Sequence, residues 1–350
     1  MIKIGLNGFG RVGRTIARII LKSNDCQLNV INELDPDIGN LAYLLKYDSI
    51  CGRFSEKVIV AKDKNALVCN DKIIPIYSSD KSELVPWEKH DIDILIDATG
   101  VKENVLSARK LIGRGIPKVI VTHSSDEVDF TMVMGVNEDK YIPNKHHVVS
   151  SSICDVSAIA PTLFEINRLW TIENCFITTL HPWLAYQNLL DGTVSSISSP
   201  GHFWKDYSLG RNSVLSLIPK DTTAGTATLK VLPELNGKLD AISFRVPTNI
   251  VSASDMTILV KNSVSTDDLN SHFRKMSIEK EDIFELQEES LVSIDHRGTT
   301  KSAIIDAQRI KVLNGKMIKM IVWYDNEWGY GSKVIDIARI ISKKSGEVYG

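Results

Sequence analysis

Residues 2–14 read IKIGLNGFGRVGR, an apolar strand that runs directly into the pattern G-x-G-x-x-G. The glycines of the pattern are Gly8, Gly10 and Gly13. The first permits a tight turn, the second lets the backbone approach a pyrophosphate, and the third lets the following helix pack on the strand. The stretch therefore predicts the first strand, turn and helix of a dinucleotide-binding fold.

The residues that follow complete this pattern. A helical periodicity covers 15–22, and a second apolar run at 27–31 ends on Asn32 and Glu33. Glu33 follows Gly13 by 20 residues, the spacing of the acid that binds a ribose hydroxyl. An isolated glycine motif is a weak signal, and an ordinary glycine-rich turn is the alternative. The order of elements, a strand, the glycines, a helix, a second strand and an acid, favours the dinucleotide site.

Composition excludes several classes of protein. At 350 residues the chain is long enough for two domains, and it is 43% hydrophobic and 24% charged, as in globular proteins. The formal net charge of -2 gives no sign of a nucleic-acid or anionic-membrane partner. No stretch is long and apolar enough to span a bilayer, and no signal peptide precedes the first strand.

The five cysteines are odd in number and show no C-x-x-C spacing. We therefore expect free thiols in a reducing cytoplasm rather than a disulfide framework. No Cys/His cluster has metal-ligand spacing along the chain, so we expect no metal site.

Residues 1–150 alternate between strand and helix patterns, which is typical of a parallel sheet covered by helices. Ligands bind such sheets at the carboxyl ends of the strands, and Thr99, Gly100 and Thr122 fall at two of these ends. Beyond the first unit, we expect a hairpin-like pair at 57–68 and 72–77, strands at 92–97 and 118–122, and a helix at 105–112.

After residue 150 the pattern changes to strands at longer intervals, several of which alternate apolar with polar residues. This indicates an α+β domain with a large mixed sheet. The expected strands are 176–180, 241–246, 256–260, 302–306 and 317–324, and the expected helices are 158–169, 222–232, 266–275 and an amphipathic final helix at 331–343. The loop 182–217 is long, a feature often linked to function.

One cysteine lies where a thiol can be reactive. Three serines at 150–152 precede Cys154, and a serine run that opens a helix predicts an N-cap. The sulfur would then lie near the positive end of the helix dipole, which lowers the pKa of a thiol. His181 ends the apolar run 176–180, so its ring can project into a cleft. Taken singly, each residue is as readily explained as a buried structural one.

Long stretches of the chain resemble the glyceraldehyde-3-phosphate dehydrogenase family. They lie at 4–11, 44–49, 133–137, 146–150, 232–239, 244–248 and 323–330. The resemblance implies an α/β fold, with an NAD-binding Rossmann domain at 1–153 completed by a helix at 327–350, and a catalytic domain at 154–326. It also implies a homotetramer.

The resemblance implies that Cys154 is the nucleophile and His181 its acid/base partner. It implies that Asn326 holds NAD through the nicotinamide amide. The full set expected to bind NAD is Asn7, Gly8, Phe9, Gly10, Arg11, Val12, Asn32, Glu33, Thr99, Gly100, Thr122, Asn326 and Tyr330. Asn32 and Glu33 are closer to the erythrose-4-phosphate dehydrogenase branch, because the phosphorylating branch usually has Asp in place of Glu33.

The chain departs from the family around the cysteine. The family has S-C-T-T-N-C, whereas here Ile153 and Asp155 flank Cys154. Ile153 removes a hydroxyl that helps to bind inorganic phosphate, and the carboxylate of Asp155 repels an anion. Thr222 keeps a third phosphate-site hydroxyl, but Thr223 replaces the glycine after it.

The substrate-phosphate site also departs from the family. Leu184 and Tyr186 stand in place of Thr and Asp, and Leu209 aligns with a family arginine. Arg211 matches a neighbouring arginine, and Arg245 is clearly retained. We therefore assign Asp155, Thr222, Thr223, Arg211 and Arg245 to the substrate site.

These observations predict an NAD-dependent aldehyde dehydrogenase that forms a thiohemiacetal and then a thioester on Cys154, without inorganic phosphate. The substrate would be a small aldehyde, such as one derived from a sugar. One alternative is a phosphorylating glyceraldehyde-3-phosphate dehydrogenase, with compensating contacts from Lys205, Arg211 or Lys220. The other is a non-catalytic NAD-binding paralogue, which would need neither Cys154 nor His181.

Overall fold

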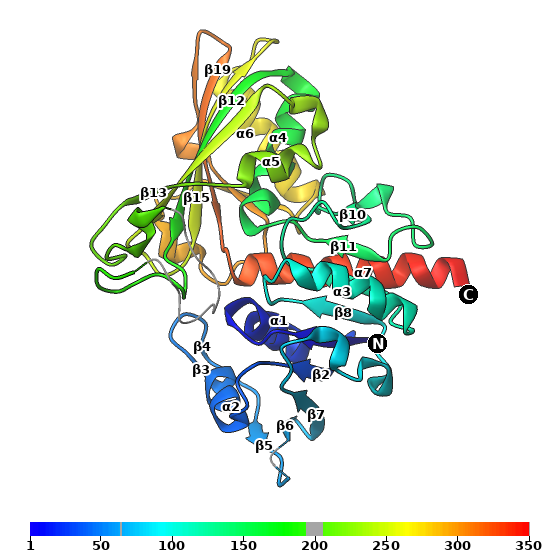
Figure 1. Ribbon diagram of the computed structural model, residues 1–350. Coiled ribbons are helices and arrows are strands. Elements are labelled where there is room, and N and C mark those ends of the chain that lie inside the picture. The colour runs from blue at the N-terminus through cyan, green and yellow to red at the C-terminus, as the bar shows by residue number, and fades with distance from the viewer. Residues whose placement is uncertain (64, 194–205, 350) are drawn as a thin grey trace. The chain divides into compact units, whose positions relative to one another are not determined.

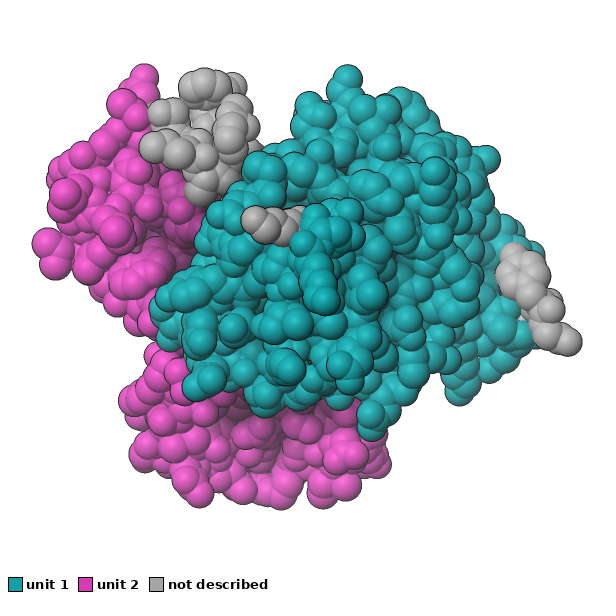
Figure 2. Space-filling model, turned by 90° about the horizontal axis from the view of Figure 1, so that it is seen from below, with its two compact units in different colours: residues 1–153, 330–350 teal, residues 154–329 magenta. Residues whose placement is uncertain are grey.

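The computed structural model describes residues 1–63, 65–193 and 206–349. Contacts divide the chain into two compact units, coloured separately in Figure 2: unit 1 comprises residues 1–153 and 330–350, and unit 2 comprises residues 154–329. The units meet along the chain between residues 153 and 154 and again between residues 329 and 330.

Unit 1 is built on a nine-stranded sheet in the order β10-β11-β9-β8-β1-β2-β7-β6-β5 (Figure 1). From β10 to β7 all neighbouring strands are parallel. The elements are β1 (Ile2–Asn7), α1 (Arg11–Lys22), β2 (Cys26–Asn32), α2 (Ile38–Lys46), β3 (Tyr47–Asp48), β4 (Gly52–Arg53), β5 (Val58–Val60), β6 (Ala66–Cys69), β7 (Lys72–Tyr77), β8 (Ile94–Asp97), α3 (Glu103–Gly113), β9 (Lys118–Val121), β10 (Phe130–Thr131), β11 (Val148–Ser150) and most of α7 (Trp328–Tyr349).

Two close backbone approaches in unit 1 require glycine. Gly8 has φ +91°, and a Cβ built at Gly13 would lie 2.1 Å from the carbonyl oxygen of Gly8. The turn after β1 and the start of α1 are therefore held as tightly as the glycine pattern predicts. Helix α7 packs on α1, because a Cβ at Gly331 would lie 3.2 Å from side-chain atoms of Thr15 and Ile19.

Unit 2 contains a mixed sheet of eight strands in the order β13-β14-β12-β15-β19-β17-β16, with β18 paired to β19. Figure 1 shows α4, α5 and α6 on one face of it. The elements are α4 (Cys154–Trp170), β12 (Ile172–Pro182), β13 (Ile218–Asp221), α5 (Ala224–Leu229), β14 (Leu239–Val246), β15 (Ser252–Val260), α6 (Thr266–Glu279), β16 (Phe284–Gln287), β17 (Ala303–Asp306), β18 (Lys311–Leu313) and β19 (Met317–Tyr324).

Strand β12 shows how the sheet presents its site residues. Cys175, Ile177, Thr179 and His181 alternate along the strand and are buried, whereas Phe176 on the opposite face is 69% exposed. Side chains alternate across a strand, so these buried residues share the face covered by α4. His181 therefore faces the helix that begins with Cys154.

The structure confirms the predicted α/β class and refines its elements. Strand β7 pairs with both β6 and β2, so the predicted hairpin is an extension of the main sheet. Helix α2 was not predicted; Asp37 caps it by accepting hydrogen bonds from Gly39 and Asn40. The predicted helix 222–232 is shorter, because α5 ends at Leu229. Within the described residues, no helix is long and apolar enough to cross a membrane.

Candidate active site

The carboxyl ends of β1, β2 and β8 carry a buried polar network in unit 1. Asn7 donates from Nδ2 to Asp97 Oδ2 at 2.7 Å and accepts from Asn32 Nδ2 at 2.8 Å. All three side chains are at most 3% exposed. The network fixes the last residues of three adjacent parallel strands, the edge at which such sheets bind ligands.

Asp97 extends this network to the next turn. Its Oδ1 accepts hydrogen bonds from the backbone N–H of Thr99 at 3.1 Å and from the hydroxyl of Thr99 at 2.6 Å. Its backbone carbonyl accepts from Thr122 N–H at 3.0 Å, and Gly100 follows in the left-handed region at φ +70°. Burial raises the pKa of Asp97. We did not predict Asp97; its position at the end of a buried strand was the available signal.

Glu33 faces the glycine turn. Its Oε2 accepts from the backbone N–H of Phe9, and its Oε1 accepts from Leu34 N–H at 2.7 Å. Arg11, at the start of α1, forms an ion pair with Asp48. The second glycine, Gly10, borders open space, since a Cβ built there meets no atom within 4 Å.

These residues fit a dinucleotide. The open side of Gly10, next to Val12 in the first turn of α1, is the cradle that a pyrophosphate requires. The carboxylate of Glu33 is held beside that turn, where a ribose hydroxyl can donate to it.

Two predicted cofactor residues lie elsewhere. The hydroxyl of Tyr330 donates to the carbonyl of Ser152 at 3.0 Å and is 2.9 Å from the Ser151 hydroxyl, so it braces the chain before Cys154. Asn326 belongs to unit 2, and its buried Oδ1 has no hydrogen-bond partner among the described residues. An orphaned amide oxygen of this kind fits an N–H donor such as a carboxamide.

Cys154 is the first residue of α4. The predicted serine N-cap is not formed, because Ser152 Oγ has no hydrogen-bond partner among the described residues, and the hydroxyls of Ser150 and Ser151 donate to carbonyls outside the helix. Ser152, two residues before Cys154, has φ +60°, a conformation that is costly for a non-glycine residue and is typical of functional sites. The Cys154 sulfur lies 3.6 Å from His181 Nε2 and 3.7 Å from Asp155 Oδ1. One thiol proton therefore has two acceptors within reach.

The tautomer of His181 follows from its other nitrogen. Nδ1 lies 2.8 Å from the carbonyl oxygen of Pro182, which can only accept, so Nδ1 carries the proton. Nε2 then has a free lone pair directed at sulfur. Burial, with the nearby charge of Arg245, lowers the pKa of His181 to about 4. At neutral pH the ring is an uncharged base.

The pKa of the Cys154 thiol differs from our expectation. Burial and the adjacent carboxylate of Asp155 raise the pKa of Cys154 well above its usual value. The prediction that the helix N-terminus lowers this pKa is therefore wrong, because burial and a neighbouring negative charge outweigh the dipole. The resting site holds a thiol beside a neutral imidazole, and the thiolate must be formed by proton transfer.

Reactivity toward an alkylating agent tests this protonation state. With a raised thiol pKa, labelling of Cys154 by iodoacetamide should be slow at pH 7 and rise about tenfold per pH unit through pH 9. Asp155→Asn should accelerate the labelling, because loss of the negative charge lowers the thiol pKa. The check is quenched mass spectrometry of the Cys154 peptide. Fast labelling at pH 6 with no pH dependence would contradict the assignment.

Strand register brings two cations to the same face as His181. Arg245 on β14 pairs directly with His181, and Lys220 on β13 pairs with Ser243, the neighbour of Thr179. Arg245 is 7% exposed; its guanidinium donates to the Tyr186 hydroxyl at 3.3 Å, and its Nε has no partner among the described residues. Burial and Arg245 lower the pKa of Lys220.

Tyr324 is a site residue that we did not predict. It is 2% exposed, and its hydroxyl donates to Asp155 Oδ1 at 2.6 Å. The two residues are 169 positions apart, so no local pattern could have joined them. Cys154, Asp155 and His181 offer donor atoms within 4.8 Å of one another, a cluster that spacing along the chain also did not show.

The remaining substrate residues are more dispersed. Thr222 accepts from Ala224 N–H at 3.1 Å, and Thr223 is exposed at the start of α5. Arg211 forms an exposed ion pair with Asp191 at 3.0 Å. Leu209 is buried. Lys205 lies outside the described residues.

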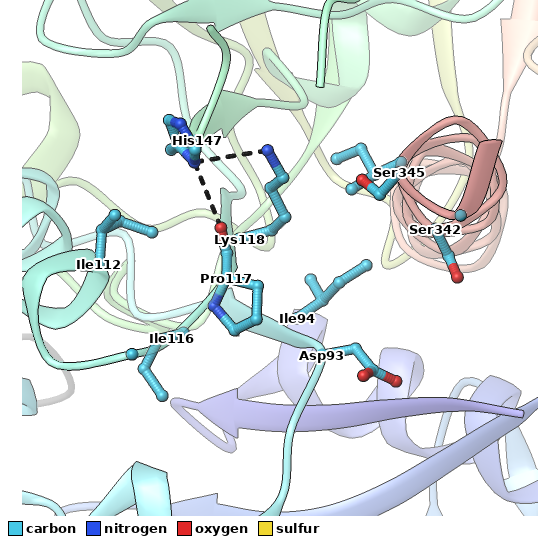
Figure 3. Close-up of a pocket in the computed structure, with 12 residues that line it drawn as sticks. Asp93, Ile94, Ile112, Ile116, Pro117, Lys118, His147, Ser342 and Ser345 are labelled. Atoms are coloured by element: carbon cyan, nitrogen blue, oxygen red, sulfur yellow. Dashed lines mark hydrogen bonds between the residues drawn. The ribbon is translucent and has the colours of Figure 1, made fainter. Parts of the chain in front are cut away.

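A cavity of about 540 Å³ lies in unit 1, at the amino ends of β8 and β9 (Figure 3). Asp93, Ile116, Lys118 and His147 line it, with Ser345 of α7, and the buried ammonium of Lys118 donates to the carbonyl of His146 at 3.1 Å. Because the dinucleotide residues follow the carboxyl ends of the strands, this cavity is not part of their site.

Comparison with known families identifies both parts of the chain. Residues 153–326 match the model described as "Glyceraldehyde 3-phosphate dehydrogenase, C-terminal domain". Residues 2–105 match "Glyceraldehyde 3-phosphate dehydrogenase, NAD binding domain". The second match contains the glycine turn, Glu33 and Thr99, and the first contains Cys154 and His181.

Curated proteins match over the whole length. A glyceraldehyde-3-phosphate dehydrogenase of Geobacillus stearothermophilus is 37% identical over 344 residues, 98% of this chain and 99% of its own. Glyceraldehyde-3-phosphate dehydrogenase 1 of Kluyveromyces marxianus is 36% identical over 98% of this chain and 100% of its own. A cytosolic glyceraldehyde-3-phosphate dehydrogenase of Pisum sativum is 36% identical over 98% of both.

Proposed function

Because the chain belongs to the glyceraldehyde-3-phosphate dehydrogenase family, we propose that it oxidises an aldehyde through a thioester on Cys154, with water rather than phosphate as the acceptor. It is an NAD-dependent oxidoreductase of that family. The observation that carries the thioester route is the contact of 3.6 Å between the Cys154 sulfur and the unprotonated Nε2 of His181. A non-catalytic protein has no need of this arrangement.

The first half of the reaction uses residues of unit 2. His181 takes the thiol proton at Nε2 while the sulfur attacks the aldehyde carbon, which gives a thiohemiacetal on Cys154. The resulting imidazolium and the buried guanidinium of Arg245 stabilise the developing oxyanion. When bound, NAD supplies the acceptor for the hydride that leaves the thiohemiacetal carbon. A thioester on Cys154 remains.

Residues of unit 1 would hold the pyrophosphate and adenosine ribose of the cofactor, and Asn326 of unit 2 its carboxamide. The turn at Gly8 and Gly10, with the first N–H groups of α1, would bind the pyrophosphate, and Glu33 would bind the adenosine ribose. Asn326 would accept from the nicotinamide carboxamide.

Glu33 predicts cofactor preference. A 2′-phosphate would meet a carboxylate fixed by the Phe9 and Leu34 N–H groups, so the kcat/KM with NADP should fall at least about 10²-fold below that with NAD. Glu33→Gln should narrow this difference, because it removes the charge and keeps the shape. Initial rates with both cofactors measure it. Equal turnover with NADP would show that Glu33 does not face the ribose.

The loss of residues that would bind phosphate supports water as the acceptor of the acyl group. Ile153 supplies no donor, and Asp155 places a carboxylate beside the sulfur. Arg211 is paired with Asp191 on the surface, so it adds nothing to an anion site at the sulfur.

A phosphorylating glyceraldehyde-3-phosphate dehydrogenase is the second candidate. Arg245, with an unpartnered Nε among the described residues, and Lys220 form a cationic pair on the face of His181. This pair could hold one phosphate. NADH formation from a panel of aldehydes, each with and without inorganic phosphate, separates the two functions. If none of the aldehydes is oxidised, the protein only binds NAD.

We also propose that the enzyme is a homotetramer. On the outer face of the unit 2 sheet, Phe176 is 69% and Ile242 is 54% exposed, and Leu180 lies on the same face. An apolar sheet face of this kind is suited to bury against a second copy of the chain. Light scattering of the purified protein measures the number of chains. The free thiols fit a reducing cytoplasm.

A further inference from the structure

Asp155 contacts the reacting sulfur, and a second hydrogen bond holds it there. Repulsion of phosphate alone does not require either contact. Asp155 Oδ1 lies 3.7 Å from Cys154 Sγ and accepts from the Tyr324 hydroxyl at 2.6 Å. The side chain is 6% exposed. Both contacts fall on Oδ1, and Oδ2 has no hydrogen-bond partner among the residues that the structure describes.

A thioester that is cleaved by water needs a base near the carbonyl carbon. Water is a weak nucleophile, and a positioned carboxylate or imidazole contributes about 10²–10⁴-fold by taking its proton in the transition state. The thioester carbon is bonded to Cys154 Sγ, so a water that attacks it lies within one hydrogen bond of a carboxylate at this distance from sulfur. Oδ2 is free to accept that hydrogen bond, while Tyr324 fixes the orientation of the carboxylate.

We propose that Asp155 is the general base of thioester hydrolysis, an inference that rests on the proposed function. Asp155 takes a proton from water as the water oxygen bonds to the thioester carbon. The tetrahedral intermediate collapses with cleavage of the carbon–sulfur bond, which releases the acid and leaves a thiolate. The proton on Asp155 Oδ2 then passes to sulfur through a water molecule, and His181 loses to solvent the proton that it took from the thiol. The resting thiol, carboxylate and neutral imidazole are restored.

The resting structure matches the end of this cycle. The thiol of Cys154 is already in contact with Asp155 Oδ1, so the sulfur and the carboxylate are adjacent when the proton returns. The raised pKa of Cys154 makes its thiolate a good acceptor for that proton. His181 has only one free nitrogen, which faces the sulfur and is used to form the thiolate in the first half of the reaction.

Transient kinetics of Asp155→Asn tests the proposal. With an aldehyde oxidised by the wild type, the variant should keep a burst of one NADH per site, because acylation does not use Asp155. Steady-state turnover after the burst should fall by about 10²–10⁴-fold, and the acyl-enzyme should accumulate on Cys154. Quenched mass spectrometry detects that species. Hydroxylamine, which attacks a thioester without a base, should restore turnover and give a hydroxamate.

Two further variants provide controls. Asp255→Asn makes the same substitution on the opposite face of the sheet, where Asp255 pairs with Lys319, and should leave both phases unchanged. Tyr324→Phe keeps the packing and removes the hydrogen bond that orients Asp155. It should slow deacylation by about tenfold and leave the burst amplitude at one per site. A merely structural role for Tyr324 would lower both phases together.

Two results would overturn the assignment and are distinguishable from failure of the proposed function. If Asp155→Asn hydrolyses its thioester at the wild-type rate, His181 or bulk water supplies the base. If the variant loses its burst, Asp155 acts in acylation instead. Absence of NADH formation by the wild type with every aldehyde would count against the proposed function itself.

Discussion

Replacement of Cys154 by serine is expected to abolish NADH formation from any aldehyde, with a loss on the order of 10⁴-fold or more. A serine hydroxyl is not deprotonated by the neutral imidazole of His181 as a thiol is, so neither the hemiacetal anion nor the acyl-enzyme forms. Binding of NAD should change little, because the residues that fit the pyrophosphate and the adenosine ribose lie in unit 1 and, within the described residues, none of them contacts Cys154. The measurements are initial rates and NAD titration by fluorescence.

Cys51→Ser is the matched control for this variant. Cys51 is half-buried in unit 1, and its removal should leave turnover at the wild-type level. If Cys154→Ser turned over aldehyde at an appreciable rate, the thioester route would be wrong for this enzyme. An equal loss of turnover in both variants would indicate that the two thiols support the stability of the protein rather than catalysis.

The second large expected effect is weak binding of inorganic phosphate and of a phosphorylated substrate. Glyceraldehyde 3-phosphate should be a poor substrate, and added inorganic phosphate should not raise turnover with the true substrate. Each lost hydrogen bond to a charged group costs about 1.5–3 kcal/mol, and every 1.4 kcal/mol is about tenfold in affinity. Loss of the donors at Ile153, Leu184 and Leu209 therefore weakens phosphate binding by orders of magnitude. The carboxylate of Asp155 adds repulsion in the same direction.

The comparison is best made against a relative. The Geobacillus stearothermophilus enzyme, assayed in parallel with glyceraldehyde 3-phosphate and increasing phosphate, supplies the reference. We expect its rate to depend on phosphate and the rate of this enzyme to be low and independent of it. A phosphate-dependent rate comparable to that of the reference would show that Arg245 and Lys220 rebuild an anion site, and would favour the phosphorylating reaction.

Local sequence was sufficient to predict the dinucleotide fold. Gly8 and Gly13 are required by close backbone approaches, and such requirements are visible in the residues themselves. Helix α2 was missed because Gly39 and Asn40 in its first turn are weak helix formers, and Asp37 compensates as a cap.

The chemical environment of the cysteine could not be predicted to the same depth. The sequence placed Cys154 at a helix start, and the dipole argument then suggested a low pKa. Burial and the carboxylate of Asp155 reverse that direction. The carboxylate is visible in the sequence, but the burial follows from the packing of α4 against β12, β15 and β19, which no local pattern shows. Tyr324 was not predicted as a site residue for the same reason. Its partner, Asp155, is distant in the chain and adjacent only in the fold.

The proposed reaction forms a thioester on Cys154 with reduction of NAD and cleaves that thioester with water. Rapid mixing of enzyme and NAD with an oxidisable aldehyde, in phosphate-free buffer, followed by acid quench and peptide mass analysis, tests it most directly. We expect one NADH per site in the burst and one acyl group on the Cys154 peptide, followed by continued turnover. NADH formed with no acyl group on Cys154, or a single burst that proceeds to turnover only when phosphate is added, would contradict it.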